Sequence, residues 1–220
     1  MRILEVPRRA DPRLIAELGT MVVAHLSDSV ERLYAGGPLL RPMHKGGVLA
    51  GSAFTVRTAP GDNLLVHKAL DTAQPGDVIV VDGGGFLDHA LIGGIMAAWA
   101  KQRGIAGLVL WGAIRDSAEI AADTFPVYAC GVTHRGPYKN GPGEINVPIV
   151  MGGMTVHPGD IVVGDADGLI AIPLDMAERV LASAKAIRAK EAVTMEQIAA
   201  RTVDRSWVDK ALKDKGYKLT

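Results

Sequence analysis

A Pro-Gly-Asp turn followed by an uninterrupted run of β-branched residues occurs twice in this chain. The first copy is Pro75-Gly76-Asp77 before residues 78–81, and the second is Pro158-Gly159-Asp160 before residues 161–163. A run without polar alternation is typical of a strand that is buried on both faces of a sheet. No shorter repeat period is present, so the two copies indicate a sheet-rich core with similar edges and not a solenoid.

Other segments show the patterns of helices and further strands. Residues 11–36 have helical spacing, and Asp11-Pro12 fits an N-cap followed by the first helical position. Within this region we expect a second short helix that is capped by Ser27 or Asp28 and runs to Tyr34. The remaining expected elements are a strand over 47–58, a helix from Asp62 through 69, a helix over 89–102 that is capped by Asp88 and ends at Gly104, a strand over 105–111, and helices over 174–220.

The order of these elements indicates one α/β domain with helical termini. Helices and strands alternate along the chain, and no linker separates two parts of it. The segment over 131–146 is a long polar loop with four glycines and two prolines. Loops of this length in compact domains tend to be functional or to pack on a partner. We therefore assign residues 1–220 to a single domain.

The composition excludes some classes of protein. Hydrophobic residues make up 48% of the 220 residues, which is enough for a substantial core. The 24 Lys and Arg residues balance the 24 Asp and Glu residues, whereas nucleic-acid-binding proteins usually have a basic excess. The single cysteine, Cys130, excludes an intramolecular disulfide, and we expect a buried thiol at the end of a strand. With no signal-peptide pattern and no run of about 18 apolar residues, we expect a cytoplasmic protein with no membrane and no nucleic-acid partner.

The pair Arg115-Asp116 follows the buried strand expected over 105–111, and ligands of α/β proteins gather at the carboxyl ends of strands. The planar guanidinium of Arg115 can bind a carboxylate through two hydrogen bonds. The carboxylate of Asp116 is a ligand that suits a hard divalent cation such as Mg²⁺. A structural interpretation is also open, because Asp116 and Glu119 have the spacing of a capping box for a helix over 117–122.

Two consecutive glycines, Gly93 and Gly94, interrupt the helical pattern over 89–102. Each glycine inside a helix costs about 1 kcal/mol relative to alanine. If the helix begins near Gly93, the backbone N–H groups of Gly94, Ile95 and Met96 are unpaired and form an anion site. The alternatives are close approach of another group to the backbone, or tight packing of the helix against a sheet.

Three further motifs have a structural interpretation. Asp82-Gly83-Gly84-Gly85 lacks the spacing of a dinucleotide- or phosphate-binding loop, which favours a flexible turn. Asp165-Ala166-Asp167-Gly168 lacks the distant glutamate of a calcium loop, which favours a hairpin turn. None of the six histidines has metal-ligand spacing, and we keep only His134, in the loop over 131–146, as a candidate site residue.

Over residues 22–173 the chain resembles the RraA-like family, which includes the class II 4-hydroxy-4-methyl-2-oxoglutarate aldolases. The resemblance rests on several stretches together and on no single one. They are Leu26-Ser27-Asp28-Ser29, residues 50–57, Pro60-Gly61-Asp62-Asn63, residues 75–82, residues 106–109, residues 112–116 and residues 158–168.

This resemblance implies a compact fold of stacked β-sheets flanked by helices, of the swivelling β/β/α type. It also implies a homotrimer or a hexamer with sites at subunit boundaries. In the aldolases, the residues that match Gly93, Gly94, Ile95 and Met96 contact the substrate, partly through backbone N–H groups. The residue that matches Arg115 binds the substrate carboxylate, and the one that matches Asp116 holds a divalent metal, usually magnesium or manganese.

One position departs from the aldolase pattern. The aldolases usually carry an acidic residue 21 positions before the arginine, and this chain has Gly94 there. In the aldolases that carboxylate helps to organise the water shell of the metal. The resemblance therefore leaves Asp116 as the main anchor of the metal in this chain.

The resemblance implies an enzyme, a carbon–carbon lyase that depends on a divalent metal, with Mg²⁺ as the expected cofactor. It would cleave substrates of the 4-hydroxy-4-methyl-2-oxoglutarate type to pyruvate and decarboxylate oxaloacetate, both through a metal-stabilised pyruvate enolate. The alternative is a non-catalytic oligomeric regulator that binds a protein partner such as a ribonuclease, as the founding member of the family does. Gly94 favours this alternative, and the Arg115-Asp116 pair opposes it. A third hypothesis gives the same pocket to a different 2-oxo or hydroxy acid.

Overall fold

Strand β2 (Leu49–Thr58) lies inside the main sheet, and both Pro-Gly-Asp turns end beside it. In this computed structural model, β3 (Asp77–Ile92) pairs with β2 in parallel and β9 (Ile161–Gly164) pairs with it antiparallel. Asp77 and Ile161 both lie opposite Ser52. The strand residues after each turn are buried, as predicted. The two copies therefore flank one central strand.

The structure describes residues 1–218, and within them the main sheet has eight strands in the order β1-β5-β4-β3-β2-β9-β10, with β6 paired to β2. The other strands of this sheet are β1 (Arg41–Pro42), β4 (Gly107–Ile114), β5 (Val127–Val132), β6 (Gly143–Ile145) and β10 (Leu169–Ile172). Strands β2 to β5 pair in parallel, which explains their continuous apolar runs. β9 and β10 form the hairpin that the Asp165–Gly168 turn predicted.

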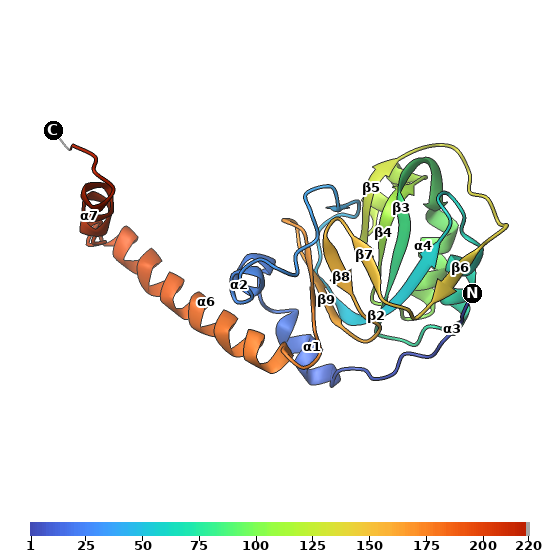
Figure 1. Ribbon diagram of the computed structural model, residues 1–220, viewed down its shortest axis with the longest axis horizontal. Helices are drawn as coiled ribbons and strands as arrows, with labels where there is room; N and C mark the ends of the chain where they lie inside the picture. Colours follow the sequence, from blue (N-terminus) through green and yellow to red (C-terminus); the bar gives the residue numbers. More distant parts are fainter. Residues whose placement is uncertain (219–220) are drawn as a thin grey trace. The chain divides into compact units, whose positions relative to one another are not determined.

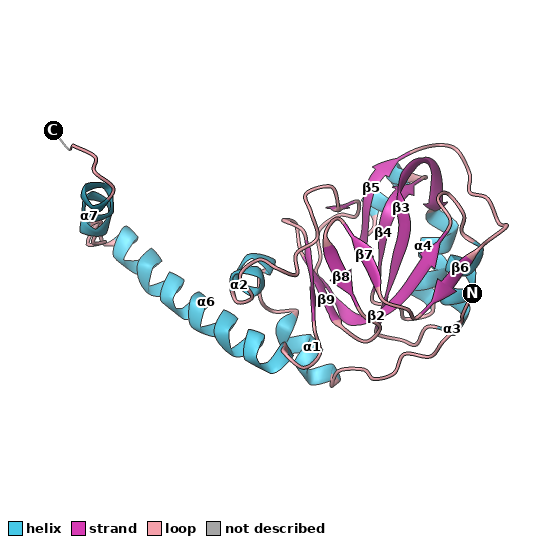
Figure 2. Ribbon diagram, in the orientation of Figure 1, coloured by secondary structure: helices cyan, strands magenta, loops and turns pink. Residues whose placement is uncertain are grey.

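Each face of the main sheet is covered by a different layer (Figure 1, Figure 2). Helices α3 (Leu64–Thr72), α4 (Gly94–Gln102) and α5 (Ser117–Ala122) cover one face, and their apolar residues pack with Phe54 and Ile79. The hairpin of β7 (Ile149–Met151) and β8 (Met154–Val156) covers the other face and packs with Ala53 and Val78. Neighbouring strand residues point to opposite faces, which produces the two separate clusters. The predicted α/β class, with sheets flanked by helices, is confirmed.

A third apolar cluster joins the β9–β10 hairpin to helices at both ends of the first compact unit, Met1–Ala184. It includes α1 (Pro12–Leu18), α2 (Val23–Asp28) and the first turns of α6 (Ala177–Ala199). The predicted N-cap of α1 is confirmed, since the Asp11 carboxylate accepts a hydrogen bond from the N–H of Arg13 at 2.8 Å.

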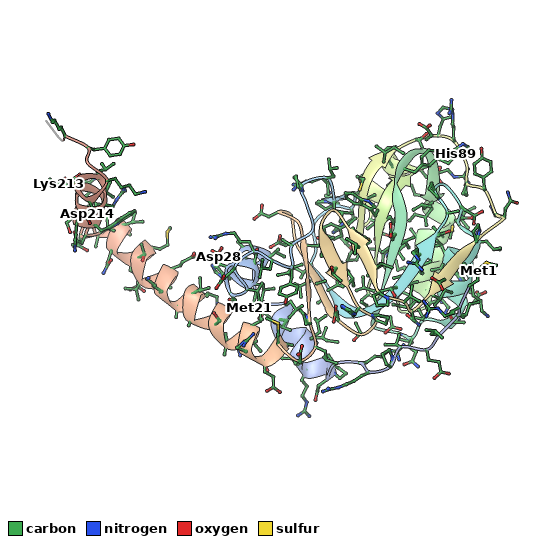
Figure 3. The ribbon with its side chains drawn as sticks, viewed as in Figure 1. Met1, Met21, Asp28, His89, Lys213 and Asp214 are labelled. Carbon is green, nitrogen blue, oxygen red and sulfur yellow. The ribbon has the colours of Figure 1, made fainter. Side chains whose placement is uncertain are left out.

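The second compact unit, Lys185–Thr220, consists of the rest of α6 and of α7 (Ser206–Asp214). Lys213 and Asp214 mark the C-terminal end of α7 (Figure 3). Helices were predicted over 174–220, and this is confirmed for 177–199 and 206–214, whereas residues 200–205 and 215–218 are not helical and residues 219–220 lie outside the described residues. Among residues 1–218, no helix has both the length and the apolar character that crossing a membrane requires.

The helical pattern over 11–36 is divided in the structure, and this corrects the prediction. α1 ends at Leu18, and α2 begins only at Val23 and ends at Asp28. No helix starts at Ser27 or Asp28. The N–H of Val23 donates to the carboxylate of Asp165 at 2.8 Å, so a residue that is distant in sequence caps the start of α2. Local spacing could not show this tertiary cap.

The segment over 82–92 is also corrected. The structure places Asp82–Gly85 and residues 86–92 within β3, and not in a flexible turn and a helix capped by Asp88. β3 follows β4 through three register shifts between Asp82 and Ile92. Glycines with positive φ, Gly84 and Gly85, allow the strand to bend there. Pairing with β4 therefore decides the structure of this segment.

Candidate active site

The carboxyl ends of β3 and β4 bring the two main candidate motifs together. The two strands are parallel, and Ile92 lies opposite Ile114 at their ends. The chain leaves β3 through Gly93 into α4, and it leaves β4 through Arg115 and Asp116 into α5. The N–H of Arg115 donates to the carbonyl of Ile92 at 3.0 Å. Parallel pairing thus places the glycine pair and the Arg-Asp pair at one edge of the sheet.

Asp116 has a strained backbone and contacts the start of α4. Its φ of 54° and ψ of 38° lie in the left-handed region, which non-glycine residues seldom adopt. Its side chain makes no capping bond to α5; Oδ2 accepts a hydrogen bond from the N–H of Gly94 at 3.0 Å. The capping-box interpretation is therefore wrong, although the helix that it predicted does span Ser117–Ala122. Strain of this kind is concentrated at functional sites.

Side chains from the β4–α5 corner fill the space beside Gly93 and Gly94. A Cβ atom on Gly93 would overlap Oδ2 of Asp116 and would lie 3.0 Å from Cγ of Arg115. A Cβ atom on Gly94 would overlap the carboxylate of Glu119. Two interpretations of Gly93 and Gly94 are confirmed: a helix begins here, and other groups approach the backbone closely. The approaching groups are side chains and not the sheet.

The N-terminal end of α4 is a smaller anion site than predicted. The N–H of Gly94 donates to Asp116, and the N–H of Met96 donates to the carbonyl of Gly93 at 3.1 Å. Within residues 1–218, only the N–H of Ile95 among the three has no hydrogen-bond partner. The expectation of three unpaired N–H groups is therefore wrong, because Asp116 satisfies one and the tight first turn satisfies another. A ligand at this position would be bound by the N–H of Ile95.

A pocket of about 160 Å³ contains most of the predicted site. The residues that line it are Asn63, His67, Ile92, Gly93, Ile95, Met96, Arg115, Asp116, Pro137 and Lys139. Gly94 lies beside it and lines a smaller cavity of about 50 Å³ together with Glu119. Pockets for drug-sized ligands measure about 300–1,000 Å³. This pocket therefore suits a small molecule.

The charged groups of the pocket are only loosely paired. Nε of Arg115 lies 3.8 Å from Oδ2 of Asp116, and both side chains are 44% exposed. Such an exposed pair contributes little to stability. Within the described chain, no hydrogen bond engages the Arg115 guanidinium. Its fork of donors is therefore available to a ligand.

His67 lies in the same pocket, and its surroundings favour the neutral form of its imidazole. Burial lowers the pKa of its imidazole, and the nearby charge of Lys139 lowers it further, although Asp71 acts in the opposite direction. A neutral imidazole offers one N–H donor and one acceptor. His67 can therefore donate a hydrogen bond to an anionic group without adding a positive charge.

Four pocket residues were not predicted from the sequence: Asn63, His67, Pro137 and Lys139. Asn63 stands in one of the stretches that carry the family resemblance, and Lys139 stands in the long polar loop that was expected to be functional. These two signals could have found them. His134, the histidine that was kept as a candidate, is exposed and is not among the lining residues.

His89 has a structural role in the same loop region (Figure 3). Its ring lies 6.0 Å from that of Phe86 and 4.5 Å from that of Tyr138, measured between centroids. Its Nδ1 lies 2.7 Å from the carbonyl oxygen of Gly136. These contacts attach the loop after β5 to the end of β3.

Cys130, on β5, is half-buried instead of buried, and burial raises the pKa of its thiol.

Comparison with known proteins identifies the family of this chain. Residues 23–171 match the RraA-like family, described as Aldolase/RraA. The chain belongs to this family. The match covers both motifs of the corner and almost all of the main sheet, and it confirms the resemblance found from the sequence.

Relatives of this chain carry different names. A protein of Halalkalibacterium halodurans, provisionally named as a 4-hydroxy-4-methyl-2-oxoglutarate aldolase, is 41% identical over 177 residues, 80% of this chain and 84% of the relative. The 4-hydroxy-4-methyl-2-oxoglutarate aldolase of Thermus thermophilus is 40% identical over 124 residues, 56% of this chain and 75% of the relative. The solved structure of the RNA-processing inhibitor RraA from Thermus has a TM-score of 0.63 and 36% identity, and the match covers 68% of this chain and 91% of that one.

Proposed function

We propose that this protein is a carbon–carbon lyase that depends on a divalent metal and acts on small 2-oxo acids. It would cleave substrates of the 4-hydroxy-4-methyl-2-oxoglutarate type and would decarboxylate oxaloacetate. The names of the relatives support an aldolase-type lyase. The observation that carries the proposal is the small pocket in which Arg115, Asp116 and the start of α4 meet.

Two groups of the pocket would bind the carboxylate of the 2-oxo acid. The free fork of the Arg115 guanidinium can donate two parallel hydrogen bonds to it. The unpaired N–H of Ile95, at the positive end of α4, can donate a third. Held in this way, the acid would present its keto oxygen toward Asp116, which lines the same pocket.

The two reactions share one electron movement. In aldol cleavage the bond between C3 and C4 breaks, its electron pair moves toward the 2-keto group, and the 4-hydroxyl loses a proton to become a carbonyl. C3 then takes up a proton to give pyruvate. In the decarboxylation of oxaloacetate the bond between C3 and C4 also breaks. Carbon dioxide leaves, and the electron pair of that bond again moves toward the 2-keto group. The charge of Arg115 would stabilise the negative charge that develops on the oxygens of the substrate. A divalent cation held at Asp116 would supply Lewis-acid stabilisation of the keto oxygen.

The residues of the corner fit magnesium or manganese. Oδ2 of Asp116 is bonded to Gly94, whereas Oδ1 has no hydrogen-bond partner within the described residues. Mg²⁺ typically binds one or two carboxylates and keeps several waters. Within residues 1–218 no group of three His, Cys, Asp or Glu residues could hold a metal. The unpaired Oδ1 of Asp116 would therefore hold Mg²⁺ as a single protein ligand, with waters as the other ligands.

Glu119 would supply the second carboxylate of this site. Its carboxylate lies against Gly94, the position at which the aldolases usually carry an acidic residue. A carboxylate there can accept hydrogen bonds from waters of the metal without binding the metal itself. In this proposal, Glu119 on α5 would take the place of the acidic group that is missing at Gly94.

The test is the release of pyruvate from oxaloacetate and from 4-hydroxy-4-methyl-2-oxoglutarate, with magnesium and with a chelator. We expect release that needs magnesium and exceeds the rate of magnesium alone in buffer. Release no faster than that of the metal alone would overturn the proposal.

A regulator that binds a ribonuclease is the second candidate function. The structural match to an RNA-processing inhibitor supports it. It predicts a specific complex with a ribonuclease and no magnesium-dependent turnover. Turnover that depends on Asp116, with no such complex, would exclude it.

The assembly would be a homotrimer or a hexamer. The support is family membership, together with exposed apolar side chains on α4 beside the pocket, where Ile95 is 84% exposed and Trp99 is 48% exposed. Light scattering of the purified protein would give the mass, and a monomer at micromolar concentration would contradict this assembly.

A further inference from the structure

The second Pro-Gly-Asp turn ends in a buried carboxylate that lines a cavity away from the candidate active site. Asp160 is 6% exposed, and the cavity beside it has a volume of about 450 Å³. This volume lies within the range of about 300–1,000 Å³ that is usual for small-molecule sites. The other polar residues that line the cavity are Arg8, Tyr34, Thr155, His157 and Asp175.

The cavity and the candidate active site lie at opposite ends of β3. Ile161 lies opposite the β2 residue that also faces Asp77, so Asp160 lies near the start of β3. Ile92, at the other end of this strand, lines the Arg115 pocket. The two cavities share no lining residue. A ligand at Asp160 would therefore be separate from the proposed reaction.

The first Pro-Gly-Asp turn shows how a buried carboxylate of this kind is neutralised. In the first turn the N–H of Gln74 donates to Oδ2 of Asp77 at 2.8 Å, and in the second the N–H of His157 donates to Oδ2 of Asp160 at 2.7 Å. Asp77 also has a counter-charge, because the guanidinium of Arg9 donates to both of its oxygens. Within residues 1–218, no ion pair engages Asp160. The second turn thus lacks the cation that the first turn has.

The N-terminal segment contacts both turns but supplies a cation to only one of them. A Cβ atom on Gly159 would overlap the carbonyl oxygen of Arg8, so the backbone of Arg8 lies against the second turn. The side chain of the next residue, Arg9, pairs with Asp77. Arg8 itself is exposed, and in the described part of the chain it makes no ion pair with Asp160. The buried carboxylate therefore stays available to a ligand in the cavity.

The charges around the cavity favour a cation. Burial raises the pKa of the Asp160 carboxyl group, and the nearby charge of Asp175 acts in the same direction, although hydrogen bonds from backbone N–H groups oppose this shift. With histidine counted as neutral, the residues that line the cavity carry two carboxylates and one guanidinium, that of Arg8. The ring of Tyr34 can also attract a cation that lies over its face. A ligand with one positive charge would balance this set.

A guanidinium group fits the free positions of this carboxylate. A carboxylate has about four acceptor positions, and the backbone N–H groups of His157 and Leu174 use two of them at Asp160. The two positions that remain are those that a guanidinium needs for a pair of parallel hydrogen bonds. A metal ion fits less well, because within residues 1–218 no group of three His, Cys, Asp or Glu residues could hold one.

We propose that the cavity at Asp160 binds a small organic molecule through a guanidinium group, which pairs with the Asp160 carboxylate as Arg9 pairs with Asp77. Asp175, which is exposed, would strengthen the attraction. The site shares no residue with the Arg115 pocket, so this inference goes beyond the proposed function and does not depend on it.

A matched pair of ligands, propylguanidinium and propylurea, tests the proposal. The two molecules have the same planar end group, and only the first is charged. Saturation-transfer NMR of the full-length protein gives both dissociation constants. Hydrogen bonds between charged groups are stronger than those of neutral groups, so we expect the wild type to bind propylguanidinium about tenfold more tightly. Equal binding of the two ligands would overturn the proposal.

Three variants show whether the preference depends on this carboxylate. Asp160→Asn should remove it, because asparagine keeps an oxygen for the N–H of His157 but has no charge. Asp175→Asn, at an exposed position, should reduce it about two- to fivefold. Asp167→Asn is the control, because Asp167 is exposed in the turn between β9 and β10 and does not line the cavity. A preference that survives in Asp160→Asn, or that is unchanged in Asp175→Asn, would overturn the proposal.

A guanidinium could also come from an arginine side chain of a second copy of this chain. In that case Asp160→Asn would lower the mass that light scattering measures, and the proposal of a small molecule would fail. We expect an unchanged mass. Pyruvate release by Asp160→Asn should equal that of the wild type, because Asp160 does not line the Arg115 pocket. Absence of pyruvate release from the wild type would overturn the proposed function and leave the preference for propylguanidinium in place.

Discussion

The carboxylate of Glu119 occupies the space that a side chain on Gly94 would fill. Gly94 is the first residue of α4, and Glu119 lies in the first turn of α5. Since Gly94 also donates its N–H to Asp116, this glycine contacts both carboxylates of the corner. In our proposal, Glu119 on the neighbouring helix would supply the acidic group that the aldolases usually carry at the position of Gly94.

Moving this carboxylate back to α4 should preserve the site. Gly94→Asp alone would force two carboxylates into one space, and we expect a lower thermal midpoint and little pyruvate release. Glu119→Ala alone should weaken magnesium by about 10- to 100-fold, as expected for a group that orders the metal's waters. The double variant Gly94→Asp with Glu119→Ala should regain most of the magnesium affinity. Magnesium titrations of pyruvate release measure all three, and unchanged affinity in Glu119→Ala would exclude a role for this carboxylate.

Arg115→Ala should raise the barrier of the reaction by about 3 kcal/mol, because the developing negative charge loses a preorganised donor. This corresponds to a decrease in kcat/KM of about 100-fold. Arg115→Lys keeps the charge but loses the planar fork, so it should recover only part of the activity. Arg135→Ala is the control, because Arg135 is exposed on the loop after β5 and does not line the pocket. Equal kcat/KM values for Arg115→Ala and this control would show that Arg115 does not bind the substrate.

Asp116→Asn separates the structural role of Asp116 from its role toward the metal. Asparagine tolerates the left-handed backbone, and its side-chain oxygen can still accept the N–H of Gly94. We therefore expect a thermal midpoint close to that of the wild type. The loss of negative charge should abolish magnesium-dependent pyruvate release. A variant that keeps both its midpoint and its magnesium dependence would exclude Asp116 as the metal ligand.

The fold could be predicted from the sequence wherever a segment's own pattern decides its structure. The apolar runs after the Pro-Gly-Asp turns, the N-cap at Asp11 and the hairpin at Asp165–Gly168 are of this kind. Where a contact with a residue distant in sequence decides the structure of a segment, the prediction from the sequence was wrong. β3 continues past Gly85 because β4 pairs with it, and α2 starts late because Asp165 caps it.

The site shows the same division. Arg115 and Asp116 could be named because their residue types and their place after a buried strand indicate ligand binding. His67 and Lys139 could not be predicted from the sequence, because they are 72 residues apart. They line the same pocket because hydrogen bonds to the buried carboxylate of Asp62 hold the loop after β5 beside the start of α3. The reduced anion site of α4 likewise depends on a tertiary contact, the bond from Gly94 to Asp116.

The ion pair of Arg9 and Asp77 should be a large contributor to stability. Asp77 is 1% exposed, and the guanidinium of Arg9 donates to both of its carboxylate oxygens, at 2.8 and 2.9 Å. Arg9→Met would leave a buried carboxylate without its counter-charge, and we expect the free energy of unfolding to fall by about 3 kcal/mol. Arg2→Met is the control, since Arg2 is 59% exposed in its pair with Glu144 and should matter by less than about 1 kcal/mol. Urea unfolding measures both, and equal effects would contradict this prediction.

His44 should make the protein less stable in mild acid. Its side chain is buried against Tyr128, and burial lowers its pKa below the ordinary value of 6.5, although a hydrogen bond to the carbonyl of Val127 acts in the opposite direction. Above pH 6.5 the imidazole is neutral in both the folded and the unfolded chain, so it makes no pH-dependent contribution. Below pH 6.5 the unfolded chain takes up a proton that the folded chain does not, and stability falls until the pH reaches the folded pKa.

Urea midpoints at pH 7.5, 6.5 and 5.5 would measure this effect. The wild type should lose up to about 1.4 kcal/mol per pH unit from His44 within this window. His44→Gln does not titrate and should have a flatter profile below pH 6.5, whatever its stability at pH 7.5. His134→Gln, at an exposed position, should keep the wild-type slope. Parallel profiles for the wild type and His44→Gln would show that the proton uptake of the unfolded chain in mild acid comes from other groups, of which His67, whose pKa is also lowered, is the first to examine.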